Sequence, residues 1–187
     1  MEQLWYNNGW IQEIVGGLIT SLVTSGIYIL SLIYLRPKLV ISKSIAEDEN
    51  GCASFKFYNN SRFELVNLKL TLHMKEVASG PKGQNYRMEE IPLKFKSIDS
   101  LAPNNAKSRN DNHVNAVQVK VPDCDFLNKW KNKHSSAKLE FKICFSHGLT
   151  GLTGVTKEYY HDYSTVVEEG NFVTGNSTEI KKRTKKS

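Results

Sequence analysis

The side chains that most often carry catalysis are scattered along this sequence and form no recognisable catalytic spacing. The five histidines are His73, His113, His134, His147 and His161. No two of them form an HxxxH pair, and none combines with a cysteine at the spacing of a zinc site. Residues 148–154, GLTGLTG, match neither a GxSxG nucleophile elbow nor a phosphate loop, because no GK[ST] follows. Adjacent acids such as Glu168 and Glu169 would point to opposite faces of a strand. The sequence therefore predicts a protein that is not an enzyme and that has no metal or cofactor.

The cysteines favour the same interpretation. Cys52, Cys124 and Cys144 are an odd number, are widely spaced and contain no CxxC motif. This pattern suits reduced thiols in a cytosol better than a disulfide framework. We expect all three to be small buried hydrophobic residues.

An apolar segment near the N-terminus is the first element that the sequence defines. Residues 14–35, between Glu13 and Arg36, contain no charged side chain. As a helix they would be about 33 Å long, which matches the hydrocarbon core of a bilayer, about 30 Å thick. A signal peptide would have a basic start and a shorter apolar core, and a helix buried in a soluble core is rarely apolar on all sides for six turns. We therefore predict an N-terminal unit, 1–37, with a transmembrane helix at about 14–35.

The charges that flank this segment predict its orientation. No Lys or Arg precedes it, whereas Arg36, Lys38 and Lys43 follow. Because basic residues near a span are retained on the cytoplasmic side, the N-terminus should lie outside and the rest of the chain in the cytoplasm.

Small and hydroxyl-bearing residues recur along one side of the predicted helix. They are Gly16, Gly17, Thr20, Ser21, Thr24, Ser25 and Ser31. In lipid, such a stripe lets helices approach closely and form hydrogen bonds, so it predicts self-association. A second interpretation is a ring of helices around a pore wetted by Thr20, Thr24 and Ser31. A third is a plain anchor in which the small residues have no role.

Alternating apolar and polar residues dominate the rest of the chain. Residues 65–76 place Leu68, Leu70, Leu72 and Met74 on one face and Lys69, Thr71, His73 and Lys75 on the other, and 138–145 repeat the pattern. Further strands are expected at 38–42, 53–58, 90–95, 114–121, 154–160 and 170–173, with turns at 47–51, 58–62 and 79–83. Residues 122–133 should form one short helix, and 98–112 a polar loop.

These elements predict the fold class. It is a mainly-β cytoplasmic domain at 38–180, an antiparallel β-sandwich of Ig-like or C2-like type with one short helix, beneath one N-terminal transmembrane helix. Residues 181–187 should form a basic, disordered tail. Without the five basic residues of that tail the domain carries a net charge of only about +2, so the composition does not define a basic domain. The tail could contact anionic lipid.

Several blocks carry a resemblance to a known family. They are LRPKLVIS, FKFYNNSRFELVNLKLTLH, LEFKICFSHGLTG, EYYHDY and EEGNFVTGNSTEI. In these blocks the chain resembles small single-span bacterial membrane proteins with a cytoplasmic β domain, including membrane effectors of anti-phage defence such as those of the Hailong system. The resemblance implies an inner-membrane homo-oligomer, a tetrameric ion channel opened by a deoxyadenylate oligonucleotide that a partner nucleotidyltransferase makes.

Such a ligand would require cations for its phosphates and planar groups for its bases. The candidates in the resembling blocks are Lys56, Asn59, Asn60, Ser61, Arg62, Lys69, His147, Tyr159 and Tyr160. Lys56 and Lys69 are expected on outward strand faces, and alternation requires that Tyr159 or Tyr160 lie in the core.

Two functions follow from the sequence. The first is an oligomeric membrane effector of anti-phage defence, an ion channel gated by an oligonucleotide or cyclic-nucleotide signal. The second is a membrane-tethered, non-enzymatic scaffold whose β-sandwich docks a cytosolic protein. The hydroxyl stripe favours the first, and the small net charge of the domain favours the second.

Overall fold

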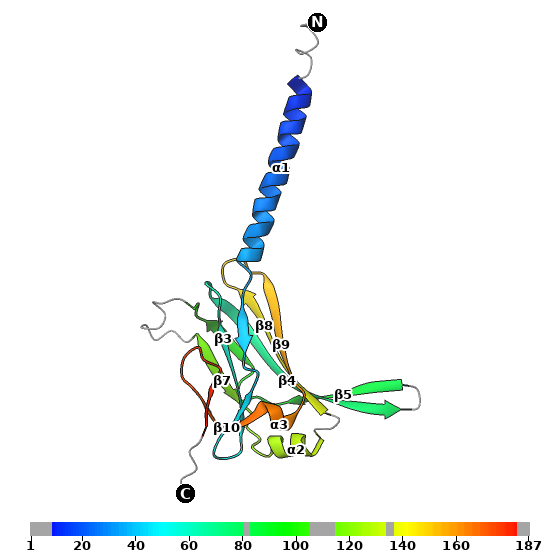
Figure 1. Cartoon of the computed structure of the whole chain (residues 1–187), viewed down its shortest axis with the longest axis vertical. Helices are drawn as coiled ribbons and strands as arrows, with labels where there is room; N and C mark the ends of the chain where they lie inside the picture. Colours follow the sequence, from blue (N-terminus) through cyan, green and yellow to red (C-terminus); the bar gives the residue numbers. More distant parts are fainter. Residues whose placement is uncertain (1–8, 81–82, 105–114, 134–136, 183–187) are drawn as a thin grey trace. The chain divides into compact units, whose positions relative to one another are not determined.

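The computed structural model describes residues 9–80, 83–104, 115–133 and 137–182 (Figure 1). The chain divides into two units, Met1–Arg36 and Pro37–Ser187, and each is described by itself. Outside the described residues lie 1–8, most of the predicted polar loop, Val114 of a predicted strand, His113 and His134, and 183–187 of the predicted tail.

The first unit is one long helix, α1, which spans Gly9–Tyr34. It ends ahead of Pro37, which lacks a backbone N–H and disfavours a helical conformation at Arg36. Among the described helices α1 alone is long and apolar enough to cross a bilayer, over Gln12–Ser31. The predicted N-terminal apolar helix is therefore confirmed. Its length and composition fit a membrane span, and a signal sequence near an N-terminus would fit them too.

The second unit is built from two sheets (Figure 1). The first sheet has the order β1 (Leu39–Ile41), β3 (Ala53–Asn59), β2 (Ile45–Glu47), β10 (Val167–Phe172) and β11 (Ile180–Lys182), and β7 (Ala116–Lys120) also pairs with β3. The second has the order β5 (Gly83–Ile91), β4 (Leu65–Gly80), β8 (Ala137–His147) and β9 (Thr153–Tyr160), and β6 (Ser97–Leu101) also pairs with β4.

Aromatic side chains from both sheets meet between them. The ring of Phe55 in the first sheet lies 5.1 Å from that of Phe141 and 5.6 Å from that of Tyr160 in the second. The helix α2 (Phe126–Lys133) closes one end of the core, where Trp130 is fully buried and its indole Nε1 donates to the carbonyl of Ala137 at 3.2 Å. The predicted β-sandwich with a short helix is thus confirmed. A further four-residue helix, α3 (Tyr163–Val166), precedes β10.

The sandwich departs from the prediction in several elements. Residues 97–101 form β6, although 98–101 were expected in the polar loop, because Leu101 and Ile98 pair along β4 and extend the second sheet. The strand expected at 90–95 is correct only for residues 90 and 91, since β5 ends at Ile91 and Pro92 follows with no N–H to donate. Strands β2 and β11 were not expected, and β2 pairs with β10 in parallel. Because β11 contains Lys181 and Lys182, these two residues are not part of a disordered tail.

The expectation of three reduced, buried cysteines is also wrong. Cys52 and Cys124 form a disulfide across 72 residues of sequence, and all three cysteines are half-buried. The two residues meet because β7 pairs with β3, which brings the segment before α2 beside the turn that ends at Cys52. That turn is held by the Asp48 carboxylate, which accepts from the backbone N–H of Asn50 and of Cys52, both at 3.0 Å. Cysteines so far apart in sequence give no spacing motif, so the sequence alone did not predict this disulfide.

Candidate functional site

Four hydroxyl groups of α1 donate hydrogen bonds to backbone carbonyls of the same helix. Thr20 and Thr24 donate to the carbonyls four residues earlier, Gly16 and Thr20, at 2.8 Å each, and Ser31 donates to Ile27 at the same distance. Ser21 donates to Leu18 at 2.9 Å. Each of these four hydroxyl oxygens keeps acceptor capacity toward a neighbour, and none of the four needs to place an unsatisfied proton in lipid.

The glycines of α1 have no packing role within the described chain. A Cβ atom built at Gly16, Gly17 or Gly26 would meet nothing within 4 Å among the described residues. Glycine lowers the stability of a helix interior by about 1 kcal/mol relative to alanine. Contacts within the described chain do not explain three glycines in this helix, so we expect the explanation to be a contact with another molecule. Close approach of a second helix is the usual one in membranes.

A second feature is the outer face of the β5-β4-β8-β9 sheet. We call it the lysine face, and it comprises Lys69, Lys75, Lys138, Lys142, Lys157, Glu140 and Tyr159. Strand register places these residues in adjacent rows, with Glu140 opposite His73 on one side and Tyr159 on the other. The face thus carries five lysine side chains and the carboxylate of Glu140, and Glu90 of β5 lies on the same side of the sheet, opposite His73.

The Glu140 carboxylate is unusually buried for the outside of a sheet. Glu140 is only 3% exposed, and it forms ion pairs with Lys75 and, at 3.5 Å, with Lys157. Burial acts to raise the pKa of Glu140, but the hydrogen bond and charge of Lys75, with the charge of Lys157, outweigh burial and hold this pKa below its usual value. The same hydrogen bond raises the pKa of Lys75. Lys75 therefore stays charged.

Aromatic and imidazole groups border this cluster. The ammonium of Lys75 lies 5.7 Å from the centre of the Tyr159 ring, which stacks near His161. His73 carries a buried Nδ1 atom without a hydrogen-bond partner in the described part of the chain. Cations beside an exposed ring are what phosphates and bases require.

The candidates Asn59 and Ser61 instead hold a corner of the sandwich. The amide of Asn59, which is fully buried, donates to the carbonyls of Phe63, Leu101 and Ala102 at 2.8, 3.2 and 3.0 Å. Its Oδ1 accepts from the backbone N–H and the hydroxyl of Ser61. These side chains are fully engaged by the fold.

Two further candidates are withdrawn from solvent. Lys56 lies on the outward side of β3 as expected, but it is only 4% exposed and donates to the carbonyl of Val173, beside the ring of Phe172. Lys56 is thus on the predicted face but covered, and burial lowers the pKa of its ammonium. Tyr160 is the core tyrosine that alternation required, and its hydroxyl donates to the carbonyl of Ser42 at 2.6 Å.

The remaining candidates, Asn60, Arg62 and His147, lie at one end of the sandwich. Asn60 and Arg62 are exposed, and the backbone N–H of Asn60 donates to the carbonyl of Lys38 at 2.7 Å. His147 is buried against the ring of Phe63, and its Nδ1 accepts from the backbone N–H of Thr150 at 3.2 Å. Its Nε2 has no partner among the described residues.

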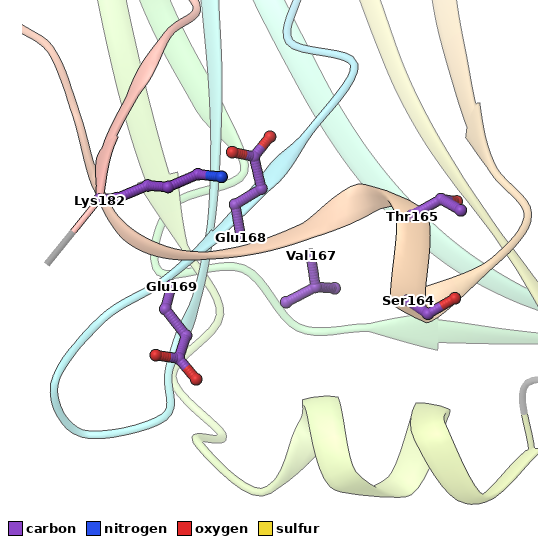
Figure 2. Close-up of a pocket in the computed structure, with 6 residues that line it drawn as sticks. All are labelled: Ser164, Thr165, Val167, Glu168, Glu169 and Lys182. Atoms are coloured by element: carbon purple, nitrogen blue, oxygen red, sulfur yellow. The ribbon is translucent and has the colours of Figure 1, made fainter.

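A shallow hollow of about 540 Å³ lies beside α3, β10 and β11 (Figure 2). Its lining residues are Ser164, Thr165, Val167, Glu168, Glu169 and Lys182. Figure 2 shows the carboxylates of Glu168 and Glu169 on opposite sides of the strand, as expected for neighbours in β10. The two acids therefore do not form a pair that could share acid and base roles. In the part of the chain that the structure describes, no three His, Cys, Asp or Glu side chains form a metal-binding group.

The structure thus divides the nine candidate ligand residues among four places. Only Lys69 and Tyr159 share the lysine face; the others lie at the sandwich end, in the core or under Phe172. Lys75, Lys142, Lys157 and Glu140 were not among the candidates. Alternation alone put each of them on an outward face, but their gathering depends on the register between strands.

Comparisons with known proteins place the chain in no family. No protein-family model matches it, and no curated protein has a matching sequence. Among solved structures it is similar to Spo0M, a sporulation control protein from Bacillus subtilis, at 7% identity and a TM-score of 0.32, covering 67% of this chain and 48% of that one. It is also similar to murine CRIg, at 13% identity and a TM-score of 0.32, covering 72% and 96%. The chain spans about half the length of the Spo0M chain. Similarities this distant carry no functional inference.

Proposed function

We propose that this protein is a single-span membrane effector that self-associates through α1 and responds to an anionic, nucleotide-type ligand on its lysine face. In its sharpest form the assembly is an ion channel of the bacterial inner membrane that acts in anti-phage defence. The observation that carries the proposal is the surface of α1. Its apolar side chains are exposed along its length, and no described residue packs against its glycines. A helix of this kind needs lipid around it and a second copy against its small residues.

The lysine face supports the sensing role. The face carries five lysines beside an exposed tyrosine ring, against the carboxylates of Glu140 and Glu90, and two of the lysines form ion pairs with Glu140. Phosphate groups would gain charge contacts there, and a base could stack on Tyr159. The defence context rests on the resemblance of the sequence blocks alone.

Two features of the sequence and structure favour opposite orientations of the chain across the membrane. Arg36, Lys38 and Lys43 favour a cytoplasmic β domain, whereas the Cys52–Cys124 disulfide is typical of an oxidising compartment. We propose the cytoplasmic orientation, because flanking charge acts while the helix inserts and before the domain folds. Thiol trapping in intact cells tests it: a cytoplasmic domain should hold the two cysteines largely reduced during growth, and a fully oxidised pair would reverse the orientation.

The assembly is tested by replacing Gly17, Ser21 and Ser25 with leucine. The variant should lose the oligomer, measured as the mass of the detergent-solubilised protein, and lose growth arrest and membrane depolarisation in cells. The matched control is Val15→Leu, Ile19→Leu and Ile33→Leu, on the side of the helix opposite the small-residue stripe as a whole at 100° per residue. An oligomer that survives the first set of changes would overturn the proposed interface.

Sensing is tested with a labelled oligodeoxyadenylate as the probe. Lys69→Glu with Lys142→Glu should abolish its binding, and added salt should weaken the wild-type interaction. The control is Lys43→Glu with Lys94→Glu, at exposed lysines outside the lysine face. Equal binding by both variants would exclude this face.

A tethered scaffold is the second candidate, and one feature favours it. The β4–β5 hairpin continues past Glu76, the last residue of β4 that pairs with β8, and projects from the sandwich (Figure 1). Exposed Tyr86 and Met88 lie on it, as on surfaces that dock proteins. A scaffold would be monomeric in detergent and would not depolarise cells.

A further inference from the structure

The five residues that join β8 to β9, 148–152, form an ordered tip with two exposed leucines. Leu149 is 65% exposed and Leu152 is 53% exposed. The backbone around them is well tied down, because Gly151 N–H donates to the His147 carbonyl and His147 N–H donates to the Leu152 carbonyl, both at 2.8 Å. Gly151 has a φ of +67°, a conformation that glycine adopts readily. The leucines are therefore displayed by a fixed turn.

The tip lies at the end of the sandwich where the chain enters from α1. Gly148 N–H donates to the carbonyl of Glu64, and a Cβ at Gly148 would come within 3.0 Å of that same oxygen. The loop that contains Glu64 reaches back to Asn60, whose N–H donates to the carbonyl of Lys38. One loop thus connects the tip to the entry point of the chain.

Covalent reach then limits how far this end can lie from a bilayer. Two residues, Arg36 and Pro37, separate Leu35 from Lys38. At no more than about 3.6 Å per residue they keep Lys38 within roughly 11 Å of the end of the span, whatever the orientation of the two units. The tip itself is uncharged, while Arg36, Lys38 and exposed Arg62 lie near the entry point, where an anionic headgroup layer would attract them.

The geometry points to the lipid interface as the partner of this tip: Leu149 and Leu152 insert among the headgroups of the membrane that α1 crosses. This inference rests on the proposed membrane span. The β domain would then contact the membrane at a second point besides α1. A shift of the domain on ligand binding at the lysine face would change the force that the domain exerts on α1.

The experiment uses the full chain in vesicles of phosphatidylcholine and phosphatidylglycerol. In the oxidised chain, in which Cys52 and Cys124 form their disulfide, Cys144→Ser removes the free thiol, and an environment-sensitive dye is attached at Leu149→Cys, with Leu152→Cys as a second probe. The matched control is Asn128→Cys on α2, which precedes β8 at the far end of the sandwich. Both 149 and 152 probes should be quenched by lipids with a headgroup-level nitroxide and shielded from iodide, whereas the 128 probe should show the reverse.

The failures of the two proposals are distinguishable. Protein that floats with the vesicles but carries iodide-quenched 149 and 152 probes would overturn the tip contact and leave the span standing. Probes shielded from both quenchers would mean that a protein surface covers the tip, which also overturns it. Protein that does not float would overturn the span and the tip together.

Discussion

Replacing Asn59 by aspartate should destabilise the β domain strongly although the two side chains have the same shape. The amide donates to three backbone carbonyls at 2.8–3.2 Å, and a carboxylate can only accept. Two to three hydrogen bonds at about 1 kcal/mol each would be lost, and carbonyl oxygens would face a carboxylate that must bury its charge or bind a proton. We expect a loss of about 3–5 kcal/mol, a large part of a typical total of 5–15 kcal/mol.

The neighbouring residue provides the control. Asn60 is exposed, and its Oδ1 accepts one hydrogen bond from Asn104 at 2.9 Å, which an aspartate would keep. Asn60→Asp should change the stability by no more than about 0.5 kcal/mol. The assay is urea unfolding of the detergent-solubilised chain, followed by the fluorescence of buried Trp130 above that of the N-terminal tryptophans. Equal unfolding midpoints for the two variants would refute the assignment of Asn59 to the corner of the sandwich.

Three further outcomes are expected. Asp48, beside Lys120, and Glu140 have pKa values below their usual 3.8 and 4.5. Their contribution to the stability of the fold should therefore be complete above about pH 5 and be lost as pH falls below about 4. Melting temperatures that do not change from pH 6 to pH 3 would contradict this. Reducing the Cys52–Cys124 disulfide, which closes a loop of 72 residues, should lower stability by about 4 kcal/mol by the chain-entropy relation, and an unchanged melting temperature in dithiothreitol would count against it. Inserting a few glycines after Lys38 should preserve the oligomer but abolish signal-dependent depolarisation, because the two-residue junction would no longer transmit motion; a wild-type response would show that the junction has no such role.

Single-strand patterns predicted the faces of the long strands well. Leu68 to Met74 and Leu139 to Phe145 alternate without interruption, so the buried side of β4 and β8 follows from period two. Strand β6 was not predicted because Ile98 and Leu101 are its only apolar residues and no alternation is visible. Its extended conformation depends on its pairing with β4. Propensity is weak where a partner strand supplies the order.

The candidate sites were harder to predict because they depend on contacts between distant segments. Alternation gave the correct side of β3 for Lys56, but the cover comes from Val173, 117 residues away. The lysine face required the register of β4, β8 and β9, which no single strand encodes. The disulfide required β7 to pair with β3. In each case the missing information is tertiary.

Recovery of the chain from carbonate-washed membranes tests the central claim most directly. If α1 spans a bilayer, the washed pellet should contain the protein, and intact-mass analysis should show that residues 9–34 are still attached. Release into the alkaline supernatant, or a mature chain that begins after α1, would contradict the span and every proposal that depends on it.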